Sequence, residues 1–331
     1  AQLTGRLSPV AGHMYDVFEV ARAKQGRIVF TEGEEEKTIR AAALWRDQSM
    51  GTAILVGREE RIFERMESLG VSPVGIQIAN AAKMENRDQF VELVYARMQR
   101  KGALLRDCQR WINLDRNVFA AALLAGGEAD AMVTGLTRSY AGAVNNVRRV
   151  LDVKPGEIIC GMSILVSDHH TIFVADTTIN EDPTAEQLAD ITVQAAEKVR
   201  RFGVEPRVAL MSFSNFGSRG ASQTKNLCGA IEILTERGVN FEFDGEMGPD
   251  TALEPEALAY YPFAGISGTA NVLVMPNLHT ANISYKLVEA MGGAHVIGPI
   301  LMGLEKPVQI VRLGATVNDL MNMAALAAVD I

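Results

Sequence analysis

Hydroxyl residues and glycine gather between Ser212 and Ser218, directly after the apolar run 208–211. The candidates for ligand binding in this segment are Ser212, Ser214, Gly217 and Ser218. A helix is predicted to follow near Thr224, and such a strand-to-helix turn directs backbone N–H groups towards bound anions. The same residue types also make ordinary turns and helix caps. The spacing alone leaves both interpretations open.

Asp244-Gly245-Glu246 places two carboxylates after the predicted strand 240–243. Ligands of α/β sheets lie at the carboxyl ends of strands, so an acid in a site is one interpretation. Asp-Gly is also a common turn pair. We favour a turn here, with Glu246 as a cap.

Amide and cationic side chains supply two further candidates. Asn282 and Lys286 are four residues apart on a predicted helix, with Tyr285 between them, and therefore share one helix face. They can bind a phosphate or an amide, or simply form an exposed polar face. Arg148 and the adjacent Arg149 can bind phosphate through two parallel hydrogen bonds, or form a surface ion pair with Asp152.

Composition excludes several classes of function. Acidic residues outnumber basic ones by 40 to 32, which argues against nucleic acid or a membrane surface as the main partner. The three cysteines are far apart and the histidines show no zinc spacing, so we expect no metal and a cytoplasmic location. No apolar run reaches 18 residues. Neither G-x-G-x-x-G nor a P-loop motif occurs, so no nucleotide site of those types is predicted.

Strands and helices are predicted to alternate along the first part of the chain, which indicates a parallel sheet. The expected strands are 27–30, 52–56, 74–78 and 131–134, and the expected helices are 14–23, 34–49, 59–69, 88–101 and 117–126.

The pattern changes near Lys154-Pro155-Gly156, where two apolar runs joined by Ser-Asp-His-His predict a β-hairpin. The hairpin strands are 158–166 and 171–176; the later strands are 208–213, 240–243, 272–275 and 295–297; and the helices are 186–201, 224–236, 280–291 and 317–329. We therefore expect lobe I at 1–153 plus 303–331 and lobe II at 154–302.

The chain from about Arg27 to Val329 resembles the phosphate acetyltransferase (phosphotransacetylase) family. The motifs that carry the resemblance are Thr31-Glu32-Gly33, the run Ala129–Gly135, Ala175-Asp176 with Asn180–Pro183, S-x-S-x-x-G-S, Asp244-Gly245-Glu246, Asn282–Lys286 and Gly298-Pro299-Ile300. The resemblance implies an α/β fold of two lobes, each a three-layer α/β/α sandwich like those of isocitrate and isopropylmalate dehydrogenases. The sheets would be mostly parallel with a small antiparallel element. It also implies a cleft between the lobes and a homodimer through lobe II.

The family's reaction moves an acetyl group between acetyl phosphate and coenzyme A. An Asp accepts the thiol proton, and a Ser-Arg pair stabilises developing charge. Asp319 matches the base, but Arg312 and Leu313 stand where the Ser and Arg are expected. Arg148 matches a ligand-contacting arginine, and another family arginine falls at Arg97 or Arg100. The resemblance thus implies no catalytic residue, with Asp319 a vestigial base position.

Within the family, the chain looks most like the C-terminal domain of bacterial hybrid NADP-dependent malic enzymes. Phrases such as Arg201–Leu210 and Asn322–Ala327 carry this likeness. We expect the chain to be part of a longer polypeptide, with NADP and a divalent metal bound only by the absent malic-enzyme half. The resemblance implies a regulatory domain that binds acetyl-CoA as an inhibitor through Arg148, Ser212, Ser214, Gly217, Ser218, Asn282, Tyr285, Lys286, Arg312 and Asp319. The full protein would be a higher oligomer. An active phosphate acetyltransferase and a purely structural oligomerisation domain are the alternatives.

Overall fold

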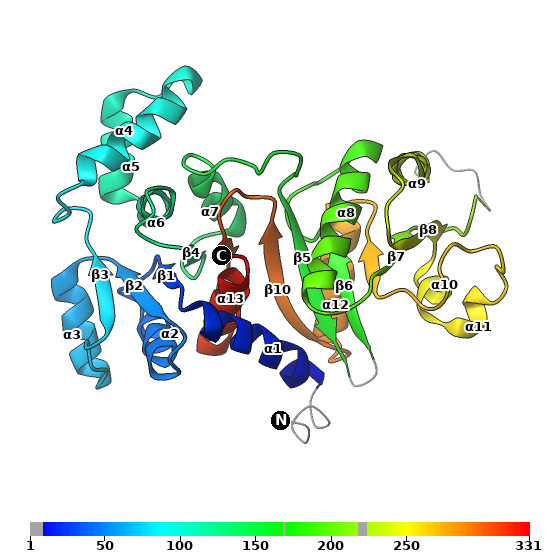
Figure 1. The fold of residues 1–331 in the computed structure, drawn as a ribbon, viewed down its shortest axis with the longest axis horizontal. Helices are drawn as coiled ribbons and strands as arrows, with labels where there is room; N and C mark the ends of the chain where they lie inside the picture. The colour runs from blue at the N-terminus through cyan, green and yellow to red at the C-terminus, as the bar shows by residue number, and fades with distance from the viewer. Residues whose placement is uncertain (1–8, 168–169, 218–223) are drawn as a thin grey trace. The chain divides into compact units, whose positions relative to one another are not determined.

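The computed structural model describes residues 9–167, 170–217 and 224–331. The chain divides into two compact units, which we name after their sheets. The five-stranded unit comprises Met14–Val153 and Leu304–Ile331. The six-stranded unit comprises Lys154–Gly303 and residues 9–13. Figure 1 shows the path of the chain through both.

The sheet of the five-stranded unit is entirely parallel, in the order β11-β4-β1-β2-β3. Its strands are β1 (Arg27–Phe30), β2 (Thr52–Val56), β3 (Ile76–Ala79), β4 (Ala131–Thr134) and β11 (Val308–Ile310). β4 and β11 are buried along their whole length. Burial of every residue is typical of strands that are covered on both faces.

Helices cover this sheet in two groups. α2 packs against α13 and β2, whereas α6 contacts β1 and β4. α4 and α5 then stack on α6, as Figure 1 shows. The bounds are α1 (Pro9–Lys24), α2 (Glu36–Asp47), α3 (Glu59–Leu69), α4 (Arg87–Met98), the short 3₁₀ helix η1 (Gln99–Lys101), α5 (Leu105–Leu114), α6 (Arg116–Ala125), α7 (Tyr140–Val147) and α13 (Val317–Val329).

The strand order reverses between β1 and β4, because the chain returns from β3 to the other side of β1. At such a reversal the loops after the two strands diverge and leave a crevice at the carboxyl ends. Here those loops are residues 31–35 and 135–139.

The sheet of the six-stranded unit is mixed, in the order β10-β5-β6-β9-β7-β8. β10, β5 and β6 form the antiparallel part, while β6, β9, β7 and β8 run parallel. The strands are β5 (Cys160–Val166), β6 (Thr171–Ala175), β7 (Arg207–Met211), β8 (Glu242–Met247), β9 (Val272–Val274) and β10 (His295–Met302).

Five helices complete this unit among the described residues: α8 (Ala185–Arg201), α9 (Lys225–Arg237), α10 (Pro249–Leu253), α11 (Pro255–Leu258) and α12 (Leu278–Ala290). α8 packs against α9 and contacts β6, β9 and β7. A capping box fixes the start of α8, since Thr184 and Gln187 exchange hydrogen bonds.

The predicted α/β class, the parallel first sheet and the antiparallel hairpin are confirmed. The turn of this hairpin was predicted at four residues, and two of them, Asp168 and His169, lie outside the described residues. β10 continues to Met302, five residues beyond the prediction, with a register shift between Ile297 and Ile300. Proline is tolerated there because β10 is an edge strand.

Candidate functional site

Four parallel strands of the six-stranded unit end at one edge, and the predicted ligand residues of this unit follow them. Ser212 begins the loop after β7, and Asn282 lies in α12 after β9. Because β7 and β9 are neighbours, the carboxyl ends of the strands bring these two segments to the same edge.

The loop after β7 is anchored by Glu246 of the adjacent strand β8. The Ser214 hydroxyl donates to Glu246 Oε1 at 2.6 Å, and the Gly217 N–H donates to the same oxygen at 3.2 Å. Ser214 and Glu246 are 4% and 1% exposed. The Ser214 hydroxyl therefore serves the loop's own structure, while Ser212 is half-buried. Ser218 lies outside the described residues.

The interpretation of Asp244-Gly245-Glu246 as a turn with Glu246 as a cap is wrong. These residues belong to β8, and Gly245 pairs in register with Leu210 of β7. Pairing with a buried neighbouring strand overrides the local turn preference of Asp-Gly. Sequence analysis consequently missed Glu246 as the loop's anchor.

Cys228 of α9 also donates to Glu246, from Sγ to Oε2 at 3.1 Å. Burial and the neighbouring carboxylate raise the pKa of the Cys228 thiol. A thiol that stays protonated is a weaker nucleophile, and the exposed Cys228 is engaged in this hydrogen bond to Glu246.

Phe216 adopts an uncommon backbone conformation in the same loop, with φ of 48°. Its ring packs against Tyr261 and Phe263, with centroid distances of 4.9 and 5.0 Å. Its N–H donates to the backbone oxygen of Glu246 at 2.8 Å. Backbone strain of this kind persists only where surrounding contacts enforce it, and it is common at ligand sites.

The segment after β6 is organised by Asp176, which is 3% exposed. Its Oδ1 accepts the Gly161 and Thr178 N–H groups at 2.8 Å each, and its Oδ2 accepts the Asn180 N–H at 2.9 Å. Asn282 of α12 joins this segment by donating to the Thr177 oxygen at 3.3 Å.

The other two α12 candidates lie in different environments. Tyr285 is buried at 5% exposure, which favours a packing role, whereas Lys286 is exposed. Asn282 is half-buried. In this helix, Lys286 therefore presents the charge that an incoming anion can reach.

In the five-stranded unit, Arg312 lies two residues beyond the end of β11 and is exposed. The loop is held close to Gly135, because the Val311 N–H donates to the Thr134 oxygen at 2.7 Å. Gly135 has φ of 110°, and a Cβ there would lie 2.3 Å from the Val311 oxygen. Leu313, where the family pattern has Arg, is 62% exposed.

Asp319 is the third residue of α13 and forms a capping box with Thr316. Its Oδ2 accepts the Thr316 N–H at 2.8 Å and the Thr316 hydroxyl at 2.9 Å, while the Asp319 N–H donates to the same hydroxyl at 3.2 Å. The carboxylate at the vestigial base position is therefore used for capping. The T-x-x-D spacing predicts this role, but sequence analysis did not use it.

Arg148 is the exposed residue that caps the end of α7. Arg149 instead lies over the Trp111 ring at 4.6 Å. Asp152, considered above as an ion-pair partner for this arginine pair, binds Arg97 at 2.5 Å. Arg97 is thus committed to a partner, and the exposed Arg100 of η1 is the alternative.

Glu32 fills the crevice between β1 and β4. It is 3% exposed and accepts the Gly135 N–H at 3.1 Å and the Thr31 hydroxyl at 2.5 Å. Burial raises the pKa of Glu32, and these hydrogen bonds partly oppose that effect. Because its own carboxylate already occupies these donors, the crevice offers fewer N–H groups to a ligand.

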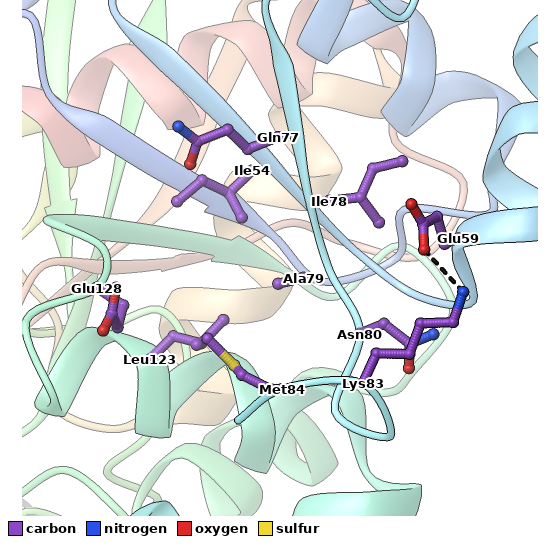
Figure 2. A pocket seen from close by; sticks show the side chains of 10 residues that line it. All are labelled: Ile54, Glu59, Gln77, Ile78, Ala79, Asn80, Lys83, Met84, Leu123 and Glu128. Atoms are coloured by element: carbon purple, nitrogen blue, oxygen red, sulfur yellow. Dashed lines mark hydrogen bonds and ion pairs between the residues drawn. The ribbon is translucent and has the colours of Figure 1, made fainter. Parts of the chain in front are cut away.

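Figure 2 shows a cavity of about 280 Å³ beside β3, lined by Ile54, Leu123, Met84 and the Glu59–Lys83 ion pair among others. None of the predicted ligand residues lines it. Within the described ranges, no group of three or more metal-binding side chains was found. No helix there is long and apolar enough to cross a membrane.

Comparison with known proteins places this geometry in a family. The family model described as phosphate acetyl/butaryl transferase matches residues 13–328. The chain belongs to this phosphate acetyl/butaryl transferase family. The resemblance predicted from the motifs is therefore confirmed.

Solved and curated members of the transferase family match nearly end to end. A phosphotransacetylase from Streptococcus pyogenes superposes with a TM-score of 0.92 at 32% identity, covering 97% of this chain and 98% of that one. The phosphate acetyltransferase of Bacillus subtilis is 32% identical over 95% of this chain and 99% of its own length.

The NADP-dependent malic enzyme of Rhizobium meliloti is more similar in sequence, with 46% identity over 99% of this chain. The match covers 43% of that enzyme, so the chain spans less than half the length of such relatives.

Proposed function

We propose that this chain is a catalytically silent phosphotransacetylase-like domain that binds acetyl-CoA and regulates an NADP-dependent malic enzyme. The observation that carries the proposal is the loop after β11. There Arg312 and Leu313 replace the family's Ser-Arg pair, and Asp319 is engaged in a capping box. Loss of one oxyanion donor lowers a rate by about 10²–10³. Because both groups are changed, we expect the chain to have lost acetyl transfer and to have kept acetyl-CoA binding.

Binding of acetyl-CoA requires cations for its phosphates and polar groups for its amides. Arg148, Arg312 and Lys286 are exposed cations. Asn282 and Ser212 supply amide and hydroxyl contacts, whereas the Gly217 N–H is already bound to Glu246. We assign these residues to the ligand, with Ser214 shaping the loop from below through Glu246.

The parent activity rests on similarity to malic enzymes about twice as long as this chain. We infer that the missing half oxidises malate to pyruvate and CO₂, and that it alone holds NADP and a divalent metal. Inhibition by acetyl-CoA then requires two states of the full enzyme that bind the effector unequally.

A dimer through the six-stranded unit is part of the proposal. α12 exposes Ile283 and Leu287, at 63 and 56%, and its C-cap residue Met291 is 78% exposed, with the half-exposed Val288 beside them. The three residues are spaced four apart, so they form one apolar stripe. An antiparallel contact about a two-fold axis through Leu287 would set Ile283 of one copy opposite Met291 of the other. This self-complementarity favours a second copy as the partner.

The stripe can be tested by sedimentation. Leu287→Glu is expected to shift the chain towards monomer, because it buries a charge in the contact. Val74→Glu is the control, since Val74 is 77% exposed and belongs to the other unit. An unchanged dimer in Leu287→Glu would rule out this surface.

Acetyl-CoA binding is tested by calorimetry on this chain and on the Arg148→Gln and Arg312→Gln variants. Removal of one phosphate contact is expected to weaken binding by roughly tenfold, equivalent to about 1.4 kcal/mol. Arg87→Gln, at an exposed ion pair with Asp88, is the matched control. In parallel, malate oxidation by the full-length enzyme should fall with acetyl-CoA. Binding that leaves malate turnover unchanged refutes the regulatory part.

An active phosphate acetyltransferase is the second candidate, favoured by the near-complete match to the Bacillus subtilis enzyme. In that case Arg312 would act as a relocated phosphate ligand. Arsenolysis of acetyl phosphate in the presence of coenzyme A distinguishes the two. Robust turnover by this chain would exclude a silent domain.

A further inference from the structure

A second cavity, of about 270 Å³, lies wholly in the five-stranded unit, at the carboxyl ends of β1, β2 and β3. Glu34 from the loop after β1, Arg58 after β2 and Asn80 after β3 line it. Asn113 at the end of α5 and Arg116 at the start of α6 also line it. This is the end of a parallel sheet at which ligands bind. None of the residues assigned to acetyl-CoA lines this cavity.

Arginine side chains surround both carboxylates of this cavity. Arg58, Arg61 and Arg116 all lie within ion-pair distance of Glu34 Oε2, at 2.9, 3.9 and 3.4 Å. Asp115, the other carboxylate of the cavity, pairs with Arg138 at 3.0 Å. Of these four guanidinium groups, those of Arg58 and Arg116 line the cavity, whereas Arg61 and Arg138 approach the two carboxylates from outside it.

Both carboxylates are already committed to protein partners. Arg58 lowers the pKa of Glu34 to about 2 through two side-chain hydrogen bonds, so Glu34 stays ionised and holds the guanidinium in place. Asp115 caps α6 by accepting the Asn117 N–H and also accepts Asn146 Nδ2 at 2.9 Å. Neither carboxylate therefore needs a bound cation.

Two side chains that line the cavity keep hydrogen-bond donors available for a ligand. Arg58 binds Glu34 through Nε and Nη2, which leaves Nη1 unused among the contacts of the described residues. Asn80 accepts the Ala82 N–H through Oδ1, so its amide nitrogen is available to donate. The walls are apolar, formed by Val56, Ala79, Ile112, Leu114 and Phe119.

We propose that this cavity is a second binding site, which takes a small phosphorylated metabolite. Its dianionic phosphate is held by the guanidinium groups of Arg58 and Arg116 and by the Asn80 amide, and its short carbon body lies against the apolar walls. Guanidinium groups suit this role because they bind phosphate oxygens in pairs.

The test is calorimetric titration of this chain with inorganic phosphate, in the presence of saturating acetyl-CoA so that the effector's own residues are covered. Phosphate binding is expected to weaken at least roughly tenfold in Arg116→Gln, because one of two charge-assisted contacts is lost. Arg110→Gln is the matched control: Arg110 is 64% exposed, pairs with Asp107 and lies outside the cavity.

A second variant guards against misfolding of the first. Asn113 is exposed and lines the cavity, so Asn113→Asp adds a negative charge at little cost to folding and should also weaken phosphate binding. Equal phosphate affinity in Arg116→Gln, Asn113→Asp and Arg110→Gln would overturn the proposal, as would tighter binding of malonate than of phosphate. Because acetyl-CoA binding is measured separately, failure of this site is distinguishable from failure of the proposed function.

Discussion

Both sheets have a buried glutamate at the carboxyl ends of their strands, but the two glutamates hold different parts of the structure. In each unit a buried glutamate ties the loop that follows the neighbouring parallel strand: Glu32 holds Gly135, and Glu246 holds Gly217. The Glu32 network continues inwards through Thr31 and Thr134 to Asn117, all within the core. The Glu246 network instead runs outwards, into the serine loop.

This difference predicts which part of each unit a variant disturbs. Loss of Glu32 should act on the centre of its unit, because its partners are strand ends that pack in the core. Loss of Glu246 should act on the loop assigned to the ligand, because Ser214 and Gly217 are both in that loop. The variants below test this contrast.

The largest effect is expected for Glu246→Ala. It leaves the buried Ser214 hydroxyl without its acceptor, which costs about 1–3 kcal/mol, and it removes the acceptor of the exposed Gly217 and Cys228, which costs less. We expect a loss of about 2–4 kcal/mol in the free energy of unfolding, measured with denaturant. Glu242→Ala is the control in the same strand, since Glu242 bonds only the exposed Ser267. Equal losses in both variants would show that Glu246 does not anchor the loop.

Gly135→Ala should break the other network by backbone strain. Its φ of 110° is unfavourable for alanine, and the added Cβ would lie 2.3 Å from the Val311 oxygen. We expect about 2–3 kcal/mol of destabilisation. Gly127→Ala separates the two causes, because Gly127 also has positive φ but has nothing within 4 Å of a Cβ. A cost no larger than that of Gly127→Ala would mean that the loop after β11 simply moves aside.

Sequence patterns predicted the parts of these units that depend on local burial. Arg27–Phe30 and Ala131–Thr134 were predicted with correct bounds, because continuous apolar runs between turns have few other structures available. The short strand β11 was not predicted, since Val308–Ile310 is three residues long and contains the buried Gln309. Such a strand forms only because β4 pairs with it.

The site was harder to predict than the fold. Asp244-Gly245-Glu246 has the local preference of a turn, and only its pairing with β7 makes it a strand. The charged cavity brings together Glu34, Arg58 and Arg116 from three segments separated by tens of residues. No spacing rule links positions that only the parallel sheet brings together.

Titration separates Glu32 from its near neighbour Glu34. Burial raises the folded-state pKa of Glu32 above the ordinary 4.5, so its contribution to stability is complete below 4.5 and is lost as pH rises through the folded-state value. Arg58 lowers the pKa of Glu34 to about 2, so its contribution is present above 4.5 and is lost as pH falls towards 2. The free energy of unfolding should be measured for the wild type, Glu32→Gln and Glu34→Gln over a pH series. The difference between the wild type and each variant should then change with pH in opposite directions for the two variants. Parallel slopes would contradict the assigned environments.

The smallest effect is expected for Asp319→Ala, at the position where the family pattern has its base. The variant removes both capping hydrogen bonds to Thr316 and a negative charge from the first turn of α13, which together stabilise a helix by about 0.5–2 kcal/mol. Thr316→Ala is the matched control, because it removes the other half of the same box. A helix cap predicts similar losses of melting temperature in both variants and no change in acetyl transfer. If Asp319 still served as a base, Asp319→Ala alone would abolish any measured arsenolysis while Thr316→Ala preserved it, and the interpretation of the carboxylate as a cap would fail.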